Sequence, residues 1–298
     1  MSDPPDQAVV VARAPSRRRL REYSLVLEAV AIEHFVIQDG RGMALVVAPE
    51  LEGRALDELA GYQRENRGPR TVAAPSPPLS IGAAFMAAAP FIVTMVVIHL
   101  LARAGVGSRS WMFAGENDVE RFRAGEWWRA VTALTLHADI PHLASNLVFG
   151  VAFLILAAQV LGAGPALLGA ILAGVIGNAL ETVFRPDGFS AIGASTAVFG
   201  AVGVLGGALW HRRRALGHVR MRRWAPVVVA LIVLAWYGMS GERTDVLAHV
   251  TGLAAGLPLG ALLDRVCSPR RSSVWLQAVT LAAPLALVAL AWRLAFEA

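Results

Sequence analysis

Three short segments of a largely apolar chain hold side chains that can do chemistry. They contain a serine (A-I-G-A-S-T-A-V-F-G), a histidine (D-V-L-A-H-V-T-G) and a histidine–asparagine pair (D-I-P-H-L-A-S-N), namely Ser195, His249, His142 and Asn146. An alcohol and an imidazole within bonding reach act as nucleophile and general base. Histidine and asparagine side chains can donate hydrogen bonds to a developing oxyanion. The four residue types are therefore those needed for nucleophilic attack on a carbonyl.

Each of these residues also has an ordinary structural role as an alternative. Ser195 can cap a helix or serve as a small residue between helices. His249 can relay protons or act as a packed hydrogen-bond donor. His142 and Asn146 can be solvated polar residues at the start of a helix. Proximity of the serine and the histidine is what separates the catalytic interpretation from these alternatives.

Metal binding is not expected. His137, Asp139 and His142 have side chains that bind zinc, but a zinc site needs three ligands that are all well placed around the metal. No His-Glu-x-x-His helix, which would place two of them, occurs in the sequence. The single cysteine, Cys267, excludes both a disulfide within the chain and a four-cysteine zinc site. We predict no metal and no cofactor.

The composition indicates that membrane helices position these residues. The 298 residues are 56% hydrophobic and 16% charged, with a mean hydropathy of +0.54, too little charge for the surface of a soluble domain. Apolar residues form seven runs that we predict to be membrane-spanning helices; the fourth and fifth are short, which is acceptable if they start below the membrane surface within a bundle. The predicted spans are 82–103, 142–161, 165–184, 194–210, 225–240, 246–263 and 274–294. The net charge of +5 then indicates loops facing anionic lipid, and we expect no nucleic-acid partner.

Glycine spacing predicts which helices meet. His249 shares one helical face with Gly252, Gly256 and Gly260, at offsets of three, seven and eleven. Such a stripe lets another helix approach closely, and the fourth span offers a similarly small surface. Both spans run in the same direction, so Ser195 and His249 fall at similar depth.

Arginine predicts the orientation. The chain has no lysine, and arginines are concentrated at 211–223 and 264–273, between spans four and five and between spans six and seven. The positive-inside rule puts these loops and the N-terminus in the cytoplasm. The connection between spans one and two then lies outside. It carries Arg109, Arg121, Arg123 and Arg129 against the trend, which indicates a folded loop whose arginines have structural partners.

The N-terminal region differs in composition from the rest. We expect a disordered tail at 1–20, a small soluble α-β-β-α domain at 21–66, and a Pro-rich linker at 67–80. The catalytic core then occupies 81–264, and a cytoplasmic loop with an extra transmembrane helix occupies 265–298. The N-terminal domain carries no recognisable chemistry, so the sequence names no partner for it.

The motifs resemble those of the rhomboid protease family. Gly193-Ala194-Ser195 is similar to the family's serine motif on its fourth helix, and His249, with Gly252 and Gly256, to its histidine motif on the sixth. His142 and Asn146 match its His-x-x-x-Asn pair on the second helix, and Trp128-Arg129 its Trp-Arg pair in the first external loop. The resemblance covers residues 82 to 264. It implies an all-α polytopic membrane protein with a rhomboid-like six-helix core and a seventh helix, preceded here by a small N-terminal α+β cytosolic domain.

The resemblance also implies roles. Ser195 is the expected nucleophile and His249 its base, forming a dyad, because Asp245 at the helix start is better explained as a cap. His142, Asn146 and the Ser195 backbone N–H form the expected oxyanion hole, with Gly193 as a supporting residue.

Two residues depart from the family pattern. Thr196 stands where the family usually has glycine, and Phe199 stands where several members have tyrosine. Phe199 can still stack on the histidine as a supporting residue.

The expected protein is an intramembrane serine endopeptidase that cuts transmembrane protein substrates within the lipid bilayer. Its expected location is a bacterial inner membrane, with the active site opening to the periplasm. The alternative is a catalytically inactive rhomboid-like protein that binds or escorts membrane proteins. A small-solute transporter would show inverted repeats, and we find no such symmetry in the sequence.

Overall fold

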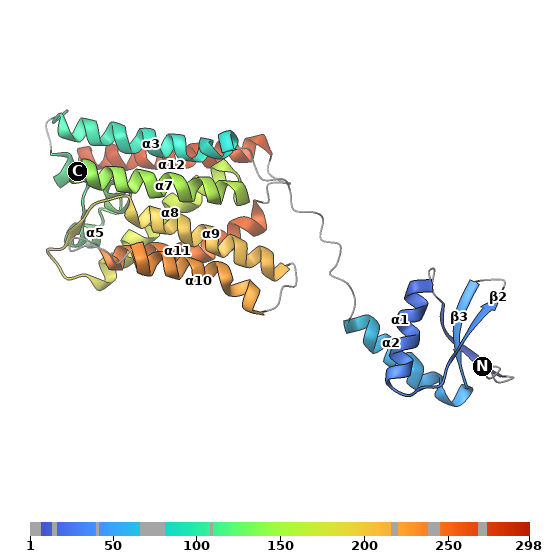
Figure 1. Ribbon diagram of the computed structural model, residues 1–298. Helices are drawn as coiled ribbons and strands as arrows, with labels where there is room; N and C mark the ends of the chain where they lie inside the picture. The colour runs from blue at the N-terminus through green and yellow to red at the C-terminus, as the bar shows by residue number, and fades with distance from the viewer. Residues whose placement is uncertain are drawn as a thin grey trace. The chain divides into compact units, whose positions relative to one another are not determined.

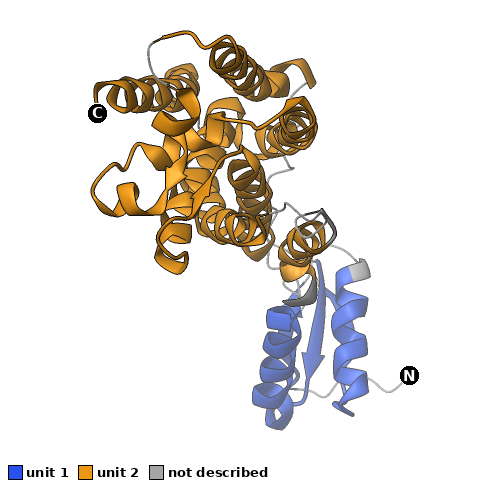
Figure 2. Ribbon diagram, turned by 90° about the vertical axis from the view of Figure 1, so that its left-hand side faces the viewer, with its two compact units in different colours: residues 1–73 blue, residues 74–298 orange. Residues whose placement is uncertain are grey.

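A computed structural model describes residues 7–13, 17–39, 42–65, 81–107, 110–215, 220–237, 245–267 and 273–298. The chain divides into two compact units, residues 1–73 and 74–298 (Figure 2). Each unit has its own hydrophobic core, so each is described separately. The expected linker at 67–80 lies outside the described residues.

The first unit is a three-stranded antiparallel sheet with two helices. Its elements are β1 (Val9–Arg13), α1 (Arg17–Ala29), β2 (Phe35–Asp39), β3 (Gly42–Val47), the 3₁₀ turn η1 (Pro49–Leu51) and α2 (Glu52–Glu65). The strand order is β1-β3-β2. Its core includes Leu20 and Leu27 of α1, Leu45 of β3 and Leu59 of α2. Apolar side chains at helical spacing and a hydrophobic central strand thus produce a small α+β unit.

The expected disordered tail at 1–20 is wrong in part. Val9–Arg13 forms β1 and pairs with β3, with Val9 opposite Val47 and Val10 opposite Val46. The run of three valines is a strong strand signal because β-branched residues fit a pleated sheet. Prolines on both sides of this run, and the arginines that follow it, obscured the signal in the sequence.

The second unit is helical, and its seven long helices lie at the positions of the seven predicted spans (Figure 1). They are α3 (Ile81–Arg103), α7 (Ile140–Leu161), α8 (Ala163–Phe184), α9 (Ser195–Ala215), α10 (Arg220–Tyr237), α11 (Val246–Val266) and α12 (Val274–Glu297). Between α3 and α7 lie α4 (Trp111–Gly115), β4 (Asn117–Asp118), α5 (Val119–Arg123), α6 (Arg129–Thr132) and η2 (Ala133–Thr135), and β5 (Ser190–Ala191) precedes α9.

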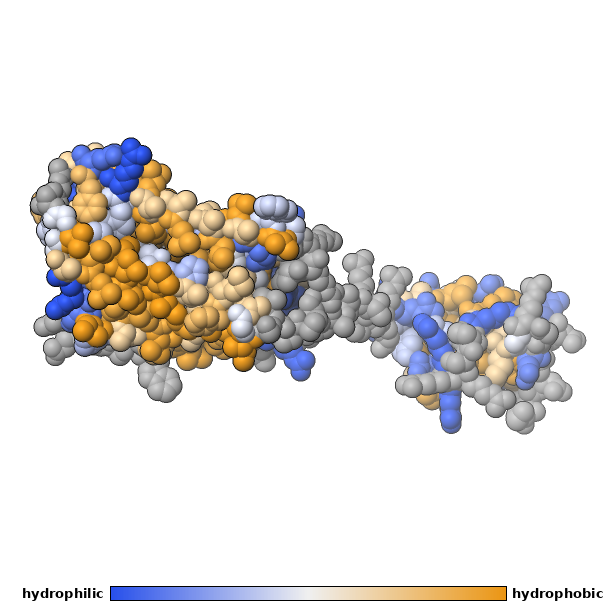
Figure 3. Space-filling view, turned by 90° about the horizontal axis from the view of Figure 1, so that it is seen from above, coloured by the Kyte–Doolittle hydropathy of each residue, from blue (hydrophilic) through white to orange (hydrophobic). Residues whose placement is uncertain are grey.

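Five of the seven helices are long and apolar enough to cross a membrane: α3, α7, α8, α11 and α12. Figure 3 shows hydrophobic residues over much of one face of this unit. Helices α9 and α10 fall outside this group; α9 ends in three arginines, and α10 includes arginines at its start. Helix α9 packs against α7, α8, α10 and α11. Because these helices surround it, little of its surface faces lipid, and it requires fewer apolar residues than a helix at the edge of the bundle. A polytopic membrane fold follows, while the six-plus-one helix count remains a prediction.

The segment between α3 and α7 is a folded loop, as the sequence analysis expected. Arg129 is 2% exposed, and its side chain bonds Glu126 and the backbone oxygens of Phe113 and Glu116. Arg123 pairs with Asp187 and donates to the backbone oxygens of Thr182, in the last turn of α8, and of Arg185, just after it. These contacts tie the loop to the bundle, and the short β4–β5 pairing connects it to the start of α9.

Candidate functional site

Ser195 occupies the first turn of α9, at the end of an ordered connection. Gly193, two residues earlier, has a φ of 131°, a conformation that residues with a side chain rarely adopt. Its N–H donates to the Ala133 oxygen at 2.9 Å, which holds this connection against the folded loop. Ser195 itself is half-buried. The glycine turn therefore presents the serine at the beginning of a helix, where backbone N–H groups lack intrahelical acceptors.

His142 lies beside the same glycine. A Cβ placed on Gly193 would lie 2.8 Å from the Nε2 of His142 and 3.8 Å from the Oγ of Ser195. The histidine ring and the serine hydroxyl therefore share one small space, which any side chain at 193 would fill. The carboxylate of Asp139 caps α7 by accepting from the His142 N–H at 2.8 Å.

Asn146 lies one turn further along α7 than His142. It is 2% exposed, and its side-chain nitrogen donates to the His142 carbonyl at 3.1 Å. The four-residue spacing thus places both side chains on one side of α7. Of the two, His142 is the one whose side chain borders the space at Gly193 and Ser195.

His249 is buried in the first turn of α11, at 6% exposure. Its ring stacks on Phe199 of α9, with ring centroids 4.4 Å apart and an angle of 31° between the planes. Phe199 follows Ser195 by one helical turn and is fully buried. Phe199 thus stacks on His249 as expected, although it lacks the hydroxyl of a tyrosine. The stacking holds the imidazole of His249 against the helix that begins with Ser195.

Glycines bring α9 and α11 into backbone contact. A methyl group on Gly252 would collide with the carbonyl oxygen of Thr196, and one on Gly256 with that of Gly200. Further along the same seam, a methyl group on Gly260 would collide with the carbonyl of Val204. The predicted close approach through the glycine stripe is confirmed. Since Gly252 follows His249 by three residues and Thr196 follows Ser195, the first turns of the two helices face each other.

Thr196, the departure beside the nucleophile, fits between two glycines. Its methyl carbon lies 2.7 Å from where a Cβ on Gly177 of α8 would be, and 3.1 Å from where one on Gly252 would be. The β-branched side chain is buried at 3% exposure. The sequence analysis did not identify Gly177, because its role depends on α8 lying against the α9–α11 seam. The added methyl group therefore occupies space that two other helices leave free.

Asp245 caps α11, accepting from the Ala248 N–H at 3.1 Å, as predicted. It is also paired with Arg185, whose Nε donates to Glu181 at 3.0 Å. Glu181 is fully buried in α8. The sequence analysis missed this link, because the three residues come from two distant segments. It anchors the helix that carries His249 to the end of α8.

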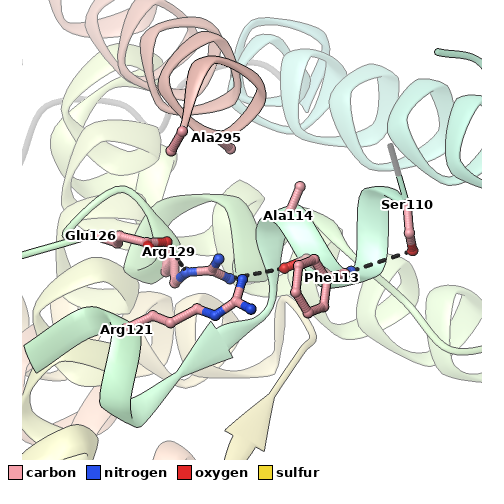
Figure 4. A pocket seen from close by; sticks show the side chains of 8 residues that line it. Ser110, Phe113, Ala114, Arg121, Glu126, Arg129 and Ala295 are labelled. Atoms are coloured by element: carbon pink, nitrogen blue, oxygen red, sulfur yellow. Dashed lines mark hydrogen bonds and ion pairs between the residues drawn. The ribbon is translucent and has the colours of Figure 1, made fainter. Parts of the chain in front are cut away.

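Trp128 and Arg129 do not join Ser195. Trp128 packs in a cluster with residues of α3 and α12, and Arg129 is held by Glu126 within the loop. Figure 4 shows Arg129 with Glu126 and Arg121 at the edge of a pocket formed by the loop and the end of α12. The contacts of the pair therefore stabilise the loop.

His137 was considered in the sequence only as a metal ligand. Its ring lies 5.1 Å from that of His142, edge to face, and it is 2% exposed. Burial, together with the charges of His142 and His99, lowers the pKa of His137 to about 3. Within the described residues, no group of three histidine, cysteine or acidic side chains is arranged to hold a metal ion.

The sequence is similar to those of several known proteins. Residues 124–265 match the Rhomboid domain family. The chain is 30% identical to Rhomboid-like protease 3 of Toxoplasma gondii over 169 residues, 56% of this chain and 64% of that protein. It is 29% identical to Rhomboid protease GluP of Bacillus subtilis over 177 residues, 58% of this chain and 34% of that protein. It is also 29% identical to Putative rhomboid protease YdcA of Bacillus subtilis over 138 residues, 46% of this chain and 68% of that protein. The chain thus spans less than two thirds of the first two relatives.

Proposed function

Because the chain belongs to the rhomboid family, we propose that it is an intramembrane serine endopeptidase with a Ser195–His249 dyad. The observation that carries the proposal is the glycine seam between α9 and α11. It sets the first turns of the two helices against each other, with Phe199 stacked on His249 and the Ser195 hydroxyl beside Gly193. The nucleophile and the base come from different helices. The backbone contact between α9 and α11 supports the proposal that the two side chains lie close together.

In the proposed reaction, His249 accepts the proton of the Ser195 hydroxyl as the oxygen attacks a peptide carbonyl. The tetrahedral intermediate collapses to an acyl-enzyme, and His249 returns the proton to the departing amine. Water then attacks the ester, again with His249 as base, and releases the acid product. Asp245 is engaged by Arg185 and the start of α11, which supports a dyad without a third acidic member.

We propose that the oxyanion is held by the Ser195 N–H, His142 and Asn146. The position of His142, at the space left free by Gly193, supports this assignment. A donor of this kind contributes about 10²–10³ in rate. Asn146→Ala should therefore lower the rate by about that factor. In the proposed reaction, the Asn146 amide turns from the His142 carbonyl, which it bonds in this structure, toward the intermediate.

The proposed substrates are transmembrane segments of other proteins. A helix protects its peptide bonds, because its carbonyls are hydrogen-bonded and shielded, so a substrate must unwind before attack. Small or helix-breaking residues near the membrane surface would ease this step. Ser195 and His249 both lie in the first turns of their helices, a depth that supports cleavage close to one membrane surface.

The proposed topology puts the N-terminal unit in the cytoplasm and the site at the opposite surface. Three arginines end α9, at the end remote from Ser195, and Arg265 lies near the end of α11. Positive charge at the ends away from the site supports this orientation. With this orientation, the proposed location is a bacterial inner membrane, and the site opens to the periplasm. The proposed arrangement is a core of six membrane helices with α12 as a seventh.

The alternative function is that of an inactive family member that binds or escorts membrane proteins. Thr196, in place of the family's usual glycine, is the residue that keeps this alternative open. Its methyl group is accommodated by Gly177 and Gly252, which favours an intact site. The two functions differ in one measurable property, the reactivity of Ser195.

The test is labelling of the full-length chain in membranes with a fluorophosphonate, which reacts with an activated serine. We expect labelling of the wild type and none of Ser195→Ala. His249→Ala should slow labelling by about 10²–10⁴, the contribution of a general base. Ser273→Ala is the control, since Ser273 caps α12 and takes no part in the site.

Equal labelling of the wild type and Ser195→Ala would refute the dyad. Absence of label on both, with both chains folded and bound to a transmembrane protein, would support the inactive alternative. Cleavage of a model transmembrane segment by the wild type, but not by Ser195→Ala, would establish the endopeptidase activity.

A further inference from the structure

The loop between α3 and α7 contains an arginine whose charge no described acidic side chain balances. Arg123 pairs with Asp187, and Arg129 pairs with Glu126. The guanidinium of Arg121 instead lies over the ring of Phe113, 3.9 Å from its centre. Among the described residues, that ring contact is the only side-chain interaction found for Arg121. A guanidinium has five donors in a planar fork, and the ring satisfies none of them fully.

Arg121 lines a pocket at the edge of the bundle. The pocket has a volume of about 580 Å³ and is bounded by the loop and by the end of α12. Figure 4 shows Arg121 and Arg129 extending toward Phe113, with Ala295 of α12 on the other side. Phe113 contacts both arginines, through its ring to Arg121 and through its carbonyl oxygen to Arg129. This volume is within the range of about 300–1,000 Å³ that is typical of small-ligand sites.

The side-chain charges of the pocket favour a ligand with one negative charge. Glu126 balances Arg129, so Arg121 is the side chain of the lining whose charge has no acidic side-chain partner among the described residues. The main chain of Ala298, at the end of the sequence, also lines the pocket. Arginine recognises phosphate and carboxylate through two parallel hydrogen bonds, and phosphate oxygens suit a fork held flat against an aromatic ring. A phosphodiester, with a single negative charge, matches the guanidinium of Arg121 in charge and in hydrogen-bonding geometry.

The pocket also lies at the depth of lipid head groups. Helix α12 has 24 residues, and a helix of that length extends roughly 36 Å, which exceeds a hydrocarbon core of about 30 Å. Ala295 is in its last turn, so the pocket is near a membrane surface. Phe113 and Trp127 of the loop are exposed, at 57% and 43%. Exposed aromatic rings at helix ends are typical of the interface between membrane and water.

We propose that this pocket binds the phosphate group of an anionic membrane lipid, with Arg121 as the residue that recognises it. The lipid's acyl chains would extend along the apolar outside of the bundle. Bound lipid would fix the folded loop at the membrane surface. The site is separate from Ser195, and its occupancy can be measured without any proteolytic activity.

The test is native mass spectrometry of the full-length chain in a non-ionic detergent, titrated with phosphatidylglycerol. We expect Arg121→Gln to raise the dissociation constant of the first bound lipid at least tenfold. Arg121→Lys, which keeps the charge but loses the fork, should raise it less. Arg103→Gln is the matched control, because Arg103 is exposed at the end of α3, next to the same loop, and outside the pocket. It should change binding less than twofold.

Three comparisons can overturn the proposal. Equal affinity of the wild type and Arg121→Gln, with unchanged melting temperatures, would exclude Arg121 as the binding residue. Equal binding of diacylglycerol with the same acyl chains would exclude phosphate recognition. Occupancy by inorganic phosphate at the same concentration as the lipid would show a site for free phosphate and overturn the lipid assignment.

Discussion

Replacing Gly252 with alanine tests whether the glycine seam sets the distance between the proposed nucleophile and base. The added methyl group would collide with the backbone carbonyl oxygen of Thr196, which cannot rotate away as a side chain can. A relaxed carbon–oxygen contact is about 3.3 Å, so α9 and α11 must separate by roughly 1 Å at this point. The change occurs within one turn of both Ser195 and His249.

The expected loss is much larger in activity than in stability. A misplacement of about 1 Å costs about 10²-fold in rate. Overpacking costs about 1–3 kcal/mol, and alanine regains about 1 kcal/mol over glycine in a helix, so the net loss of stability is about 0–2 kcal/mol. Gly252→Ala should therefore remain folded and label about 100-fold more slowly with fluorophosphonate.

Gly206→Ala is the matched control in α9. A methyl group there would meet nothing closer than 3.4 Å, and its nearest neighbour is the flexible end of Leu257. This variant should label at the rate of the wild type and melt at the same or a slightly higher temperature. The reasoning is refuted if Gly252→Ala labels normally, or if both variants lose activity equally.

Three other changes test neighbouring contacts. Phe199→Ala removes the ring stacked on His249; it should cost about 3–5 kcal/mol of stability and slow labelling, whereas Phe199→Tyr should preserve the labelling rate, as a kinetic comparison of the two would show. Arg185→Gln removes the cation that Asp245 and the buried Glu181 share; a loss of about 1–3 kcal/mol, the cost of a buried polar group that loses its partner, is expected in thermal melts, and an unchanged melting temperature would contradict this. The pKa of His137 is about 3 in the folded chain and about 6.5 when unfolded, so the unfolded state binds the extra proton and stability should fall as the pH drops from about 6.5 toward 3; His137→Leu should flatten that part of a melting-temperature profile against pH.

Much of the fold could be predicted from local sequence. Apolar runs of sufficient length, interrupted by arginine-rich segments, located all seven long helices of the second unit. Asp245 was identified as a helix cap from its position alone, because capping depends on residues within one turn. The strand at Val9–Arg13 was missed, since its pairing partner β3 lies more than 30 residues away in the sequence and local composition favoured a tail.

The candidate site was only partly predictable. The glycine offsets from His249 identified the face that contacts α9, because spacing along one helix fixes which residues share a face. The spacing did not indicate that Trp128 and Arg129 would lie apart from Ser195. Their side chains are held by partners from the loop and from α12, and such contacts depend on how the loop folds.

The sequence by itself determined the helices, their caps and the small-residue face that lets two of them touch, because each depends on residues within a few turns of one another. Only the tertiary structure decided that Gly177 makes room for Thr196, and that Arg185 connects the end of α8 to the start of α11. Those contacts join residues from different helices. Their existence depends on crossing angles and separations that result from the packing of the whole bundle.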